Sequence, residues 1–358
     1  MLFSGGLILS QSIIETLVED DSFELFITCP RWGPYHQFIR NHSKIRVVPP
    51  WILNRLLRWM HDYFWLPLLI RRVRPDIVFT LGNLPARTHF KQIFLHDNPY
   101  LAEKSIVLIP LSLTSRLIHI LRCKLTLSRM HFVDLVLVQT EYQKRGIELK
   151  LKEYLPIKLL SPYVPYPYNP IQMNTLPIPS RENKIKILCL SRYYEHKNIE
   201  ILLDLASLIK CEELPYIIYI TISANHGKKA VQIIESIKSK EIEDVIINLG
   251  HFNHNKTSNI ISQVDAIILP SLLESFSLSC VEAWYYRKPL FISNLASMQS
   301  SCHNAASYFN PSSAADILNC LEGVFSNPEK LSKIIYEGEK RLTELTKWPE
   351  YIDLLKDY

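Results

Sequence analysis

The sequence predicts an α/β protein made of two domains, each containing a parallel sheet. Apolar runs of strand length alternate with helical patterns in both halves of the chain, as they do in successive βαβ units. A proline-rich stretch separates the halves. The 358 residues, 47% of them hydrophobic and 21% charged, suffice for two cores.

The first half supplies four strand-length runs that suit a sheet covered on both faces, because such strands are apolar almost throughout. These runs are FELFITC, DIVFTLG, KQIFLHD and VDLVLVQT. We assign residues 1–165 to an N-terminal domain.

Seven prolines lie between Pro156 and Pro179. Proline has no backbone N–H and a fixed φ, so this stretch cannot continue a helix or a central strand. We therefore predict a linker at residues 166–182.

The second half repeats the alternation with five apolar runs and two clear helical patterns. The strands are KIKILCLS, YIIYITIS, DVIINLG, DAIILPS and PLFISN, and the helices are NIEILLDLASLIK and AADILNCLEGVF. We assign residues 183–340 to a second domain and residues 341–358 to a closing helix.

Positive charge is concentrated in the first half. Residues 1–170 contain 21 basic and 13 acidic residues, whereas the remainder contains 19 and 22. Segments 51–75 and 112–132 mix arginine with Trp, Phe and Leu. Such segments can bind anionic lipid headgroups, can be ordinary helices with a cationic outer face, or, least favoured here, can bind nucleic acid.

No apolar run approaches the ~20 residues that a spanning helix needs, and the start of the chain lacks a signal-peptide pattern. Seven cysteines are scattered singly, as expected for reduced thiols rather than a disulfide or zinc framework. We expect a cytoplasmic protein that can bind the inner face of the cytoplasmic membrane peripherally, with no metal site and no nucleic-acid partner.

The segment CLSRYYEHKN follows the first strand of the second domain. It places Arg192 and Lys197 at the start of a helix, where unpaired backbone N–H groups already favour an anion. Two cations there would hold a diphosphate. A solvated basic pair is the alternative, although cations are disfavoured at that end of a helix.

A second segment, LPSLLESFSLSCVEAW, carries Glu274 and Glu282 across a junction between strand and helix. In open α/β sheets, ligands bind at the carboxyl ends of strands. The alternative is that Glu274 only complements the helix dipole while Glu282 is solvated.

Together these two segments resemble the second-domain signature of family 4 glycosyltransferases, which are retaining enzymes with the GT-B fold. KPLFISN, CHNAASYFNPSSAADI and TKWPEYIDLL extend the resemblance to the end of the chain. In the first domain the resemblance covers only SGGLILSQSIIETL and FLHDNPYL. It implies two Rossmann-like domains whose parallel sheets face a central cleft, with the C-terminal helix crossing back to the first domain. Residues 1–165 would form the acceptor side, and residues 183–340 would bind the nucleotide sugar.

The resemblance also implies a role for each motif residue at the donor. Glu274 would accept hydrogen bonds from hydroxyls of the donor sugar, and Glu282 from the ribose. Arg192 and Lys197 would neutralise the departing diphosphate. The backbone N–H groups of three residues would also contact the phosphates: Phe276, Ser277 and Leu278.

In the first domain, Gly5 and Gly6 would let the backbone approach the same phosphates. His96 matches the family histidine that faces the donor sugar, and Asp97 would orient it or contact the acceptor. Without the resemblance, a structural histidine would be the favoured interpretation of His96.

The implied reaction is retaining transfer of a hexose from a nucleotide diphosphate sugar to a sugar acceptor, without metal or cofactor. We expect a lipid-linked acceptor in surface polysaccharide or lipopolysaccharide biosynthesis. The alternative is a non-catalytic protein of the same fold that binds nucleotide sugars or serves as a scaffold.

The sequence departs from the family pattern at several points, two of which lie at the predicted phosphate contacts or beside them. Ser277 stands where the family usually has glycine, which leaves the phosphate contacts of this turn open. Only MLFS precedes Gly5, so we expect the first strand to be truncated.

Overall fold

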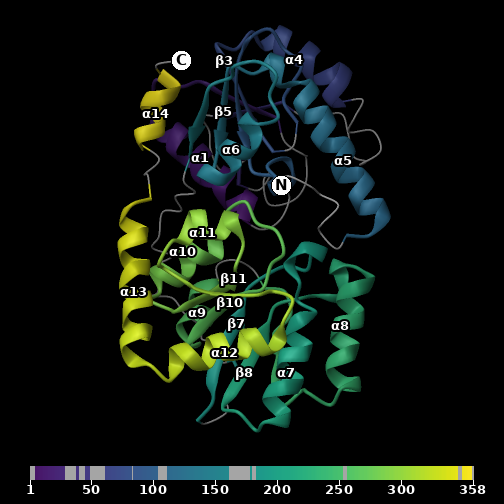
Figure 1. The fold of residues 1–358 in the computed structure, drawn as a ribbon. Helices are drawn as coiled ribbons and strands as arrows, with labels where there is room; N and C mark the ends of the chain where they lie inside the picture. Colours follow the sequence, from purple (N-terminus) through teal and green to yellow (C-terminus); the bar gives the residue numbers. More distant parts are fainter. Residues whose placement is uncertain are drawn as a thin grey trace. The chain divides into compact units, whose positions relative to one another are not determined.

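The computed structural model describes residues 5–28, 38–39, 45–48, 61–82, 84–103, 111–160, 178–179, 183–252, 256–345 and 349–356. These residues form two compact units (Figure 1). The first draws on Met1–Ile106, Ser112–Pro165 and Leu345–Tyr358, and the second on Val107–Leu111 and Tyr166–Glu344. Most of the predicted linker lies outside the described residues, and the domain boundaries stay a prediction.

A parallel sheet in the order β3-β4-β5-β6 forms the centre of the first unit. A separate parallel pair joins β1 to β2. The sequence predicts β1, β3, β4 and β5, but β2 (IRVV) and β6 (IKL) are short and each contains a basic residue. The strands are β1 (Leu25–Thr28), β2 (Ile45–Val48), β3 (Ile77–Leu81), β4 (Lys91–His96), β5 (Leu135–Val138) and β6 (Ile157–Leu159).

Helices cover both faces of the four-stranded sheet. Successive residues of a strand point to opposite faces, so Ile93 and Leu95 of β4 pack with the core that contains Leu9 of α1. Phe94 packs on the other side, with the core that contains Ile147 of α6. The helices of this part of the unit are α1 (Gly5–Glu19), α4 (Leu66–Val73), α5 (Leu113–Ser128) and α6 (Glu141–Glu148).

The last described helix, α14 (Pro349–Lys356), belongs to the first unit although it is the C-terminal element (Figure 1). Leu355 packs against the core that contains Leu9 of α1, and the Lys356 ammonium lies 2.6 Å from the Asp20 carboxylate. The predicted return of the C-terminal helix is therefore present. Among the described residues, no helix is both long and apolar enough to cross a membrane.

The second unit contains a six-stranded parallel sheet in the order β12-β11-β10-β7-β8-β9. The first strand of the unit, β7, lies centrally, and the chain adds β8 and β9 on one side before it crosses to β10 on the other. The strands are β7 (Ile185–Cys189), β8 (Tyr216–Ile220), β9 (Ile246–Asn248), β10 (Ala266–Leu269), β11 (Leu290–Ser293) and β12 (Ser307–Phe309).

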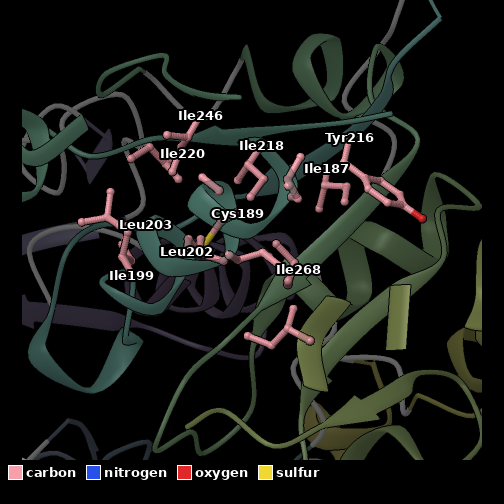
Figure 2. Packing of buried hydrophobic residues seen from close by; sticks show 14 of the residues in the cluster. Ile187, Cys189, Ile199, Leu202, Leu203, Tyr216, Ile218, Ile220, Ile246 and Ile268 are labelled. Carbon is pink, nitrogen blue, oxygen red and sulfur yellow. The ribbon is translucent and has the colours of Figure 1, made fainter. Parts of the chain in front are cut away.

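Apolar side chains of this sheet pack against helices in a large core. Figure 2 shows Ile187, Ile218 and Ile268 from three strands beside Ile199 and Leu202, the latter on α7. All five are fully buried. The helices of the unit are α7 (Ile201–Cys211), α8 (Lys228–Ser239), α9 (Thr257–Ser262), α10 (Leu278–Tyr285), α11 (Ala296–Cys302), α12 (Ala314–Phe325) and α13 (Pro328–Thr343).

Candidate functional site

The strand order of the second unit places two loops side by side. The direction of chain winding reverses between β7 and β10, which are paired neighbours. Ligands of open α/β sheets bind at such a reversal, beyond the carboxyl ends of the strands. Lys197 follows β7 in a short 3-10 turn, and Glu274 follows β10 in the loop before α10.

Lys197 and Glu274 form an ion pair at this reversal. The Lys197 ammonium lies 2.5 Å from Glu274 Oε1, and the Ser271 hydroxyl donates to the same oxygen at 2.7 Å. The side chain of Glu274 is 7% exposed and that of Lys197 18%. Burial by itself would raise the pKa of Glu274, but Lys197, His196 and the two hydrogen bonds lower it below its usual value. Glu274 is therefore ionised at neutral pH.

Hydrogen bonds hold the two loops in fixed register. The backbone N–H of Leu272 donates to the carbonyl of His196 at 2.7 Å. The Asn198 amide donates to the carbonyls of Pro270 and Pro311 at 3.0 and 2.8 Å. Asn198 has φ of +54°, a left-handed conformation that asparagine tolerates better than most residues. These hydrogen bonds hold the loops in place without a ligand, so the ion pair is positioned before a ligand binds.

Helix α10 begins next to this pair. Ser277 is its N-cap and makes no side-chain capping bond, while Leu278 is its first residue. Ser277 has φ of −102° and ψ of 122°, which any L-residue can adopt, so the turn does not need the glycine usual in the family. Phe276 and Ser277 are buried, and Glu282, one turn into the helix, is 4% exposed. Glu282 is therefore not the solvated helix residue of the alternative interpretation.

Arg192 lies on the same loop after β7, beside His226. Its guanidinium carbon is 6.0 Å from the centroid of the Tyr194 ring. His226 Nδ1 faces the backbone N–H groups of Tyr193 and Ser223, at 3.4 and 3.1 Å. Burial, then the charges of Arg192 and His251, lower the pKa of His226 to about 4. A neutral His226 thus joins the loops after β7 and β8.

In the first unit, His96 is the last residue of β4 and is 1% exposed. Burial lowers its pKa to about 4, partly offset by the nearby backbone of Asn98 and Gly82. Neither ring nitrogen makes a well-aligned hydrogen bond within the described part of the chain. Asp97 is only partly exposed. The protein atoms packed around it remove water from its carboxylate, which raises its pKa to about 6. Gly5 and Gly6 begin α1.

Within the second unit the structure pairs Lys197 with Glu274, in the loop that leads to α10; Arg192 lies on the loop after β7, near His226. Sequence reasoning missed Ser271 and Asn198, which hold the carboxylate and the loops. Asn198 directly follows Lys197 and Ser271 precedes Glu274 by three residues, but such polar residues are common in loops and give no distinct signal. Among the described residues, no group of three His, Cys, Asp or Glu side chains could hold a metal ion.

Comparison with known proteins adds a family match and a fold. Residues 176–341 match the family described as "Glycosyl transferases group 1". No curated protein matches the sequence. The resemblance predicted from the motifs is thereby confirmed for most of the second unit.

Solved structures match nearly the whole chain at low identity. Anabaena Alr3699/HepE in complex with UDP and glucose has a TM-score of 0.71 at 11% identity, covering 99% of this chain and 96% of its own. WaaG, a glycosyltransferase involved in lipopolysaccharide biosynthesis, has a TM-score of 0.67 at 12% identity, with 98% and 96% covered. TarM has a TM-score of 0.61 at 14% identity; the match covers 81% of this chain but only 56% of TarM. These likenesses confirm the predicted GT-B fold, with parallel sheets in two Rossmann-like sets.

Proposed function

We propose that this chain, whose residues 176–341 match the group 1 glycosyl transferases, transfers a sugar from a nucleotide diphosphate sugar to a sugar acceptor. The observation that carries the proposal is the ion pair of Lys197 and Glu274 at the strand-order reversal. A buried pair is costly to desolvate and is weak evidence for stability. Its place at the carboxyl ends of β7 and β10 supports a binding role instead.

The two members of the pair suit the two parts of the donor. An ionised carboxylate only accepts hydrogen bonds and can take two neighbouring sugar hydroxyls, so Glu274 binds the donor sugar. Lys197 and Arg192 bind the diphosphate and stabilise the charge that grows as it departs. Glu282 accepts the hydroxyls of the ribose.

Backbone groups complete the phosphate contacts. The first N–H groups of a helix lack intrahelical partners, and the dipole favours an anion there. Phe276, Ser277 and Leu278 provide these groups at the start of α10, and Gly5 and Gly6 provide close backbone approach from the first unit. With cations and amides supplying the charge, the reaction needs no divalent metal and no cofactor.

His96 and Asp97 act on the sugar side of the reaction. His96 is neutral at pH 7 because its pKa is about 4, so it can exchange hydrogen bonds with a sugar hydroxyl without bringing a charge. Asp97, with a pKa of about 6, orients His96 or contacts the acceptor. We further propose that transfer retains the anomeric configuration, with an oxygen of the leaving phosphate taking the acceptor proton and no protein nucleophile.

For the acceptor we propose a lipid-linked glycan of a surface polysaccharide, met at the inner face of the cytoplasmic membrane. Support comes from the fold shared with WaaG, whose own role is in lipopolysaccharide biosynthesis, and from the basic charge of residues 1–170. Which base and which sugar the donor carries depends on the shapes of the binding loops. UDP is the first nucleoside diphosphate to test, because HepE was solved with UDP.

The test has two stages, run with the full chain. Thermal shift with a panel of nucleoside diphosphates first identifies the base. Release of that diphosphate from matching nucleotide sugars is then measured in excess chelator, with and without glycan acceptors. We expect binding and turnover that both survive chelation. Binding without turnover would instead favour a non-catalytic nucleotide-sugar protein, and absence of binding would refute the proposal.

A further inference from the structure

Helix α5 in the first unit carries an unusual outer face. Five large aliphatic side chains on this one helix are exposed: Leu113 at 75%, Leu117 at 67%, Ile118 at 50%, Leu121 at 59% and Leu125 at 39%. Single exposed leucines are ordinary on protein surfaces, but a cluster of them on one element marks an interaction site.

The five side chains form one continuous stripe. At 100° per residue, Leu113, Leu117, Leu121, Leu125 and Ile118 fall within an arc of about 140°. The opposite side of the helix holds Cys123 and Leu127, which pack against the core around Phe94. The helix therefore has an inner apolar side that the fold uses and an outer apolar side that the described fold leaves uncovered.

Basic residues accompany the outer stripe. Arg122 and Lys124 are exposed; at 100° per residue, Arg122 falls ~40° beyond one edge of the stripe and Lys124 falls within it, ~20° from the other edge. Residues 112–132 contain no acidic side chain at all. Leucines inserted between the headgroups, with cations at the phosphates, describe an amphipathic helix that lies in a membrane interface.

We infer that α5 is the element by which this chain docks on a bilayer containing anionic lipids. Charge favours a bilayer over a second copy of the chain as the partner of α5. Two α5 helices facing each other would bring Arg122 and Lys124 of both copies together with no acid on either helix to neutralise them. An anionic bilayer satisfies both the cations and the leucines, and the excess of eight basic over acidic residues in residues 1–170 strengthens the attraction.

Helix α4 and the turn before it form a second exposed element that is both apolar and basic, but it is a weaker candidate for membrane binding than α5. Phe64 and Leu68 are exposed there, near Arg71 and Arg72. However, the ring of Tyr63 in the same turn is covered by the Arg87 guanidinium at 4.0 Å. The inference thus rests on α5, which has the longer stripe.

The inference deepens the proposed function, because it names the surface at which a lipid-linked acceptor would be met. Its test measures vesicle binding and not turnover. The membrane inference can therefore fail while the proposed glycosyl transfer is correct, and the proposed transfer can fail while the membrane inference is correct. The full chain is sedimented with vesicles of phosphatidylcholine alone or mixed equally with phosphatidylglycerol, at low and high salt.

Two pairs of substitutions examine the two components of the surface. Leu117→Asn with Leu121→Asn removes apolar insertion, and we expect at least about tenfold weaker binding, since burying one leucine is worth ~1.5–3 kcal/mol. Arg122→Glu with Lys124→Glu should weaken binding to anionic vesicles by about 30-fold or more, since each cation near such a surface contributes ~1 kcal/mol and 1.4 kcal/mol is tenfold.

Leu149→Asn is the matched control, because Leu149 is 80% exposed in the same unit but lies outside α5. It should bind vesicles like the wild type, and all variants should keep the wild-type circular dichroism spectrum. Two results would overturn the inference. One is wild-type protein that stays in the supernatant with anionic vesicles at low salt. The other is a dimer in gel filtration that Leu117→Asn with Leu121→Asn converts to monomer.

Discussion

Glu274 and Glu282 are both buried carboxylates, but their surroundings differ. Glu274 is held by the Lys197 ammonium and the Ser271 hydroxyl in the loop before α10. Glu282 lies within the helix, and its backbone carbonyl accepts from the N–H of Tyr286 at 3.0 Å. The first can exchange its partners for a ligand while the helix stays intact. The second is fixed in place by the helix that carries it.

Exchanging each glutamate for glutamine separates their roles. Glu282→Gln should weaken nucleoside diphosphate binding by roughly 10- to 100-fold, since hydrogen bonds to charged groups contribute ~1.5–3 kcal/mol. Glu274→Gln should leave that affinity unchanged or improve it, because Lys197 loses its competing carboxylate, while transfer falls by ~10²-fold or more. Calorimetric titration with diphosphate and a turnover assay read out both. Equal losses of affinity would refute this division of roles.

Lys197 should affect both turnover and stability. Replacing Arg192 or Lys197 by Ala should lower turnover by roughly 10²- to 10³-fold. Lys197→Ala also leaves the buried Glu274 carboxylate without its cation, which should lower the free energy of unfolding by roughly 3 kcal/mol at pH 7. Urea denaturation measures this loss. Adding Glu274→Gln to Lys197→Ala should restore most of the stability, and a double variant no more stable than Lys197→Ala would contradict the argument.

His96 should make the stability of the protein depend on pH. Its pKa is about 4 in the fold and about 6.5 in an unfolded chain. Between these values the unfolded chain binds the proton and the fold does not, so stability falls as pH drops from 6.5 towards 4. Because of His96, the free energy of unfolding at pH 5 is lower than at pH 7 by about 2 kcal/mol. Urea denaturation at pH 7 and pH 5 should show a smaller loss in His96→Asn than in the wild type; equal losses would mean that His96 titrates normally.

At the scale of elements, two helical glycines meet different surroundings. A Cβ at Gly338 of α13 would lie 2.7 Å from Cδ1 of Trp284, a buried ring on α10 whose Nε1 donates to the Ala305 carbonyl at 3.0 Å. A Cβ at Gly323 of α12 would meet only the mobile end of Lys330, at 3.8 Å. Gly338 is therefore what permits α13 to pack closely on α10.

The same substitution should have opposite effects at these two glycines. Gly323→Ala should raise the free energy of unfolding by ~0.5–1 kcal/mol, because alanine favours the helix. Gly338→Ala should lower it by roughly 1–3 kcal/mol, because overpacking outweighs that gain. Thermal denaturation followed by Trp fluorescence and circular dichroism checks both. Stabilisation by Gly338→Ala would show that α13 can move away from Trp284 at little cost.

How far each element could be predicted from the sequence depends on its burial. β5, β7, β8, β10 and β11 are apolar almost throughout because helices cover both faces of the sheets, and the sequence predicts them, as it predicts β4 with its apolar centre Ile93, Phe94 and Leu95. β2, β6 and β12 are short and each contains a polar or charged residue, so they show too little pattern. Arg192, Lys197, Glu274 and Glu282 could be named individually. The pairing of Lys197 with Glu274, 77 residues apart, could not, since it follows from the strand order.

At the scale of the whole molecule, donor binding should protect one unit far more than the other. A ligand at one hundred times its dissociation constant stabilises the state that binds it by about 2.7 kcal/mol. With UDP, or whichever diphosphate binds, hydrogen exchange should slow most in residues 190–198 and 270–282, and should not change in α5. Protection confined to the first unit would place the nucleotide away from the predicted loops.

The strand order of the second unit also affects how the site comes into being. The ion pair joins residues 77 positions apart, and β10 can pair with β7 only after β8, β9 and the helices between them have been made. At a synthesis rate of ~5–20 residues per second, roughly 4 to 15 seconds separate the two halves of the site on the ribosome. During that interval β7 has an open edge and Lys197 has no carboxylate partner. Such non-local closure is slow for entropic reasons as well. The donor can therefore stabilise the finished unit but cannot guide its early folding, and the exposed edge of β7 is the point at which misfolding of the nascent chain is most expected.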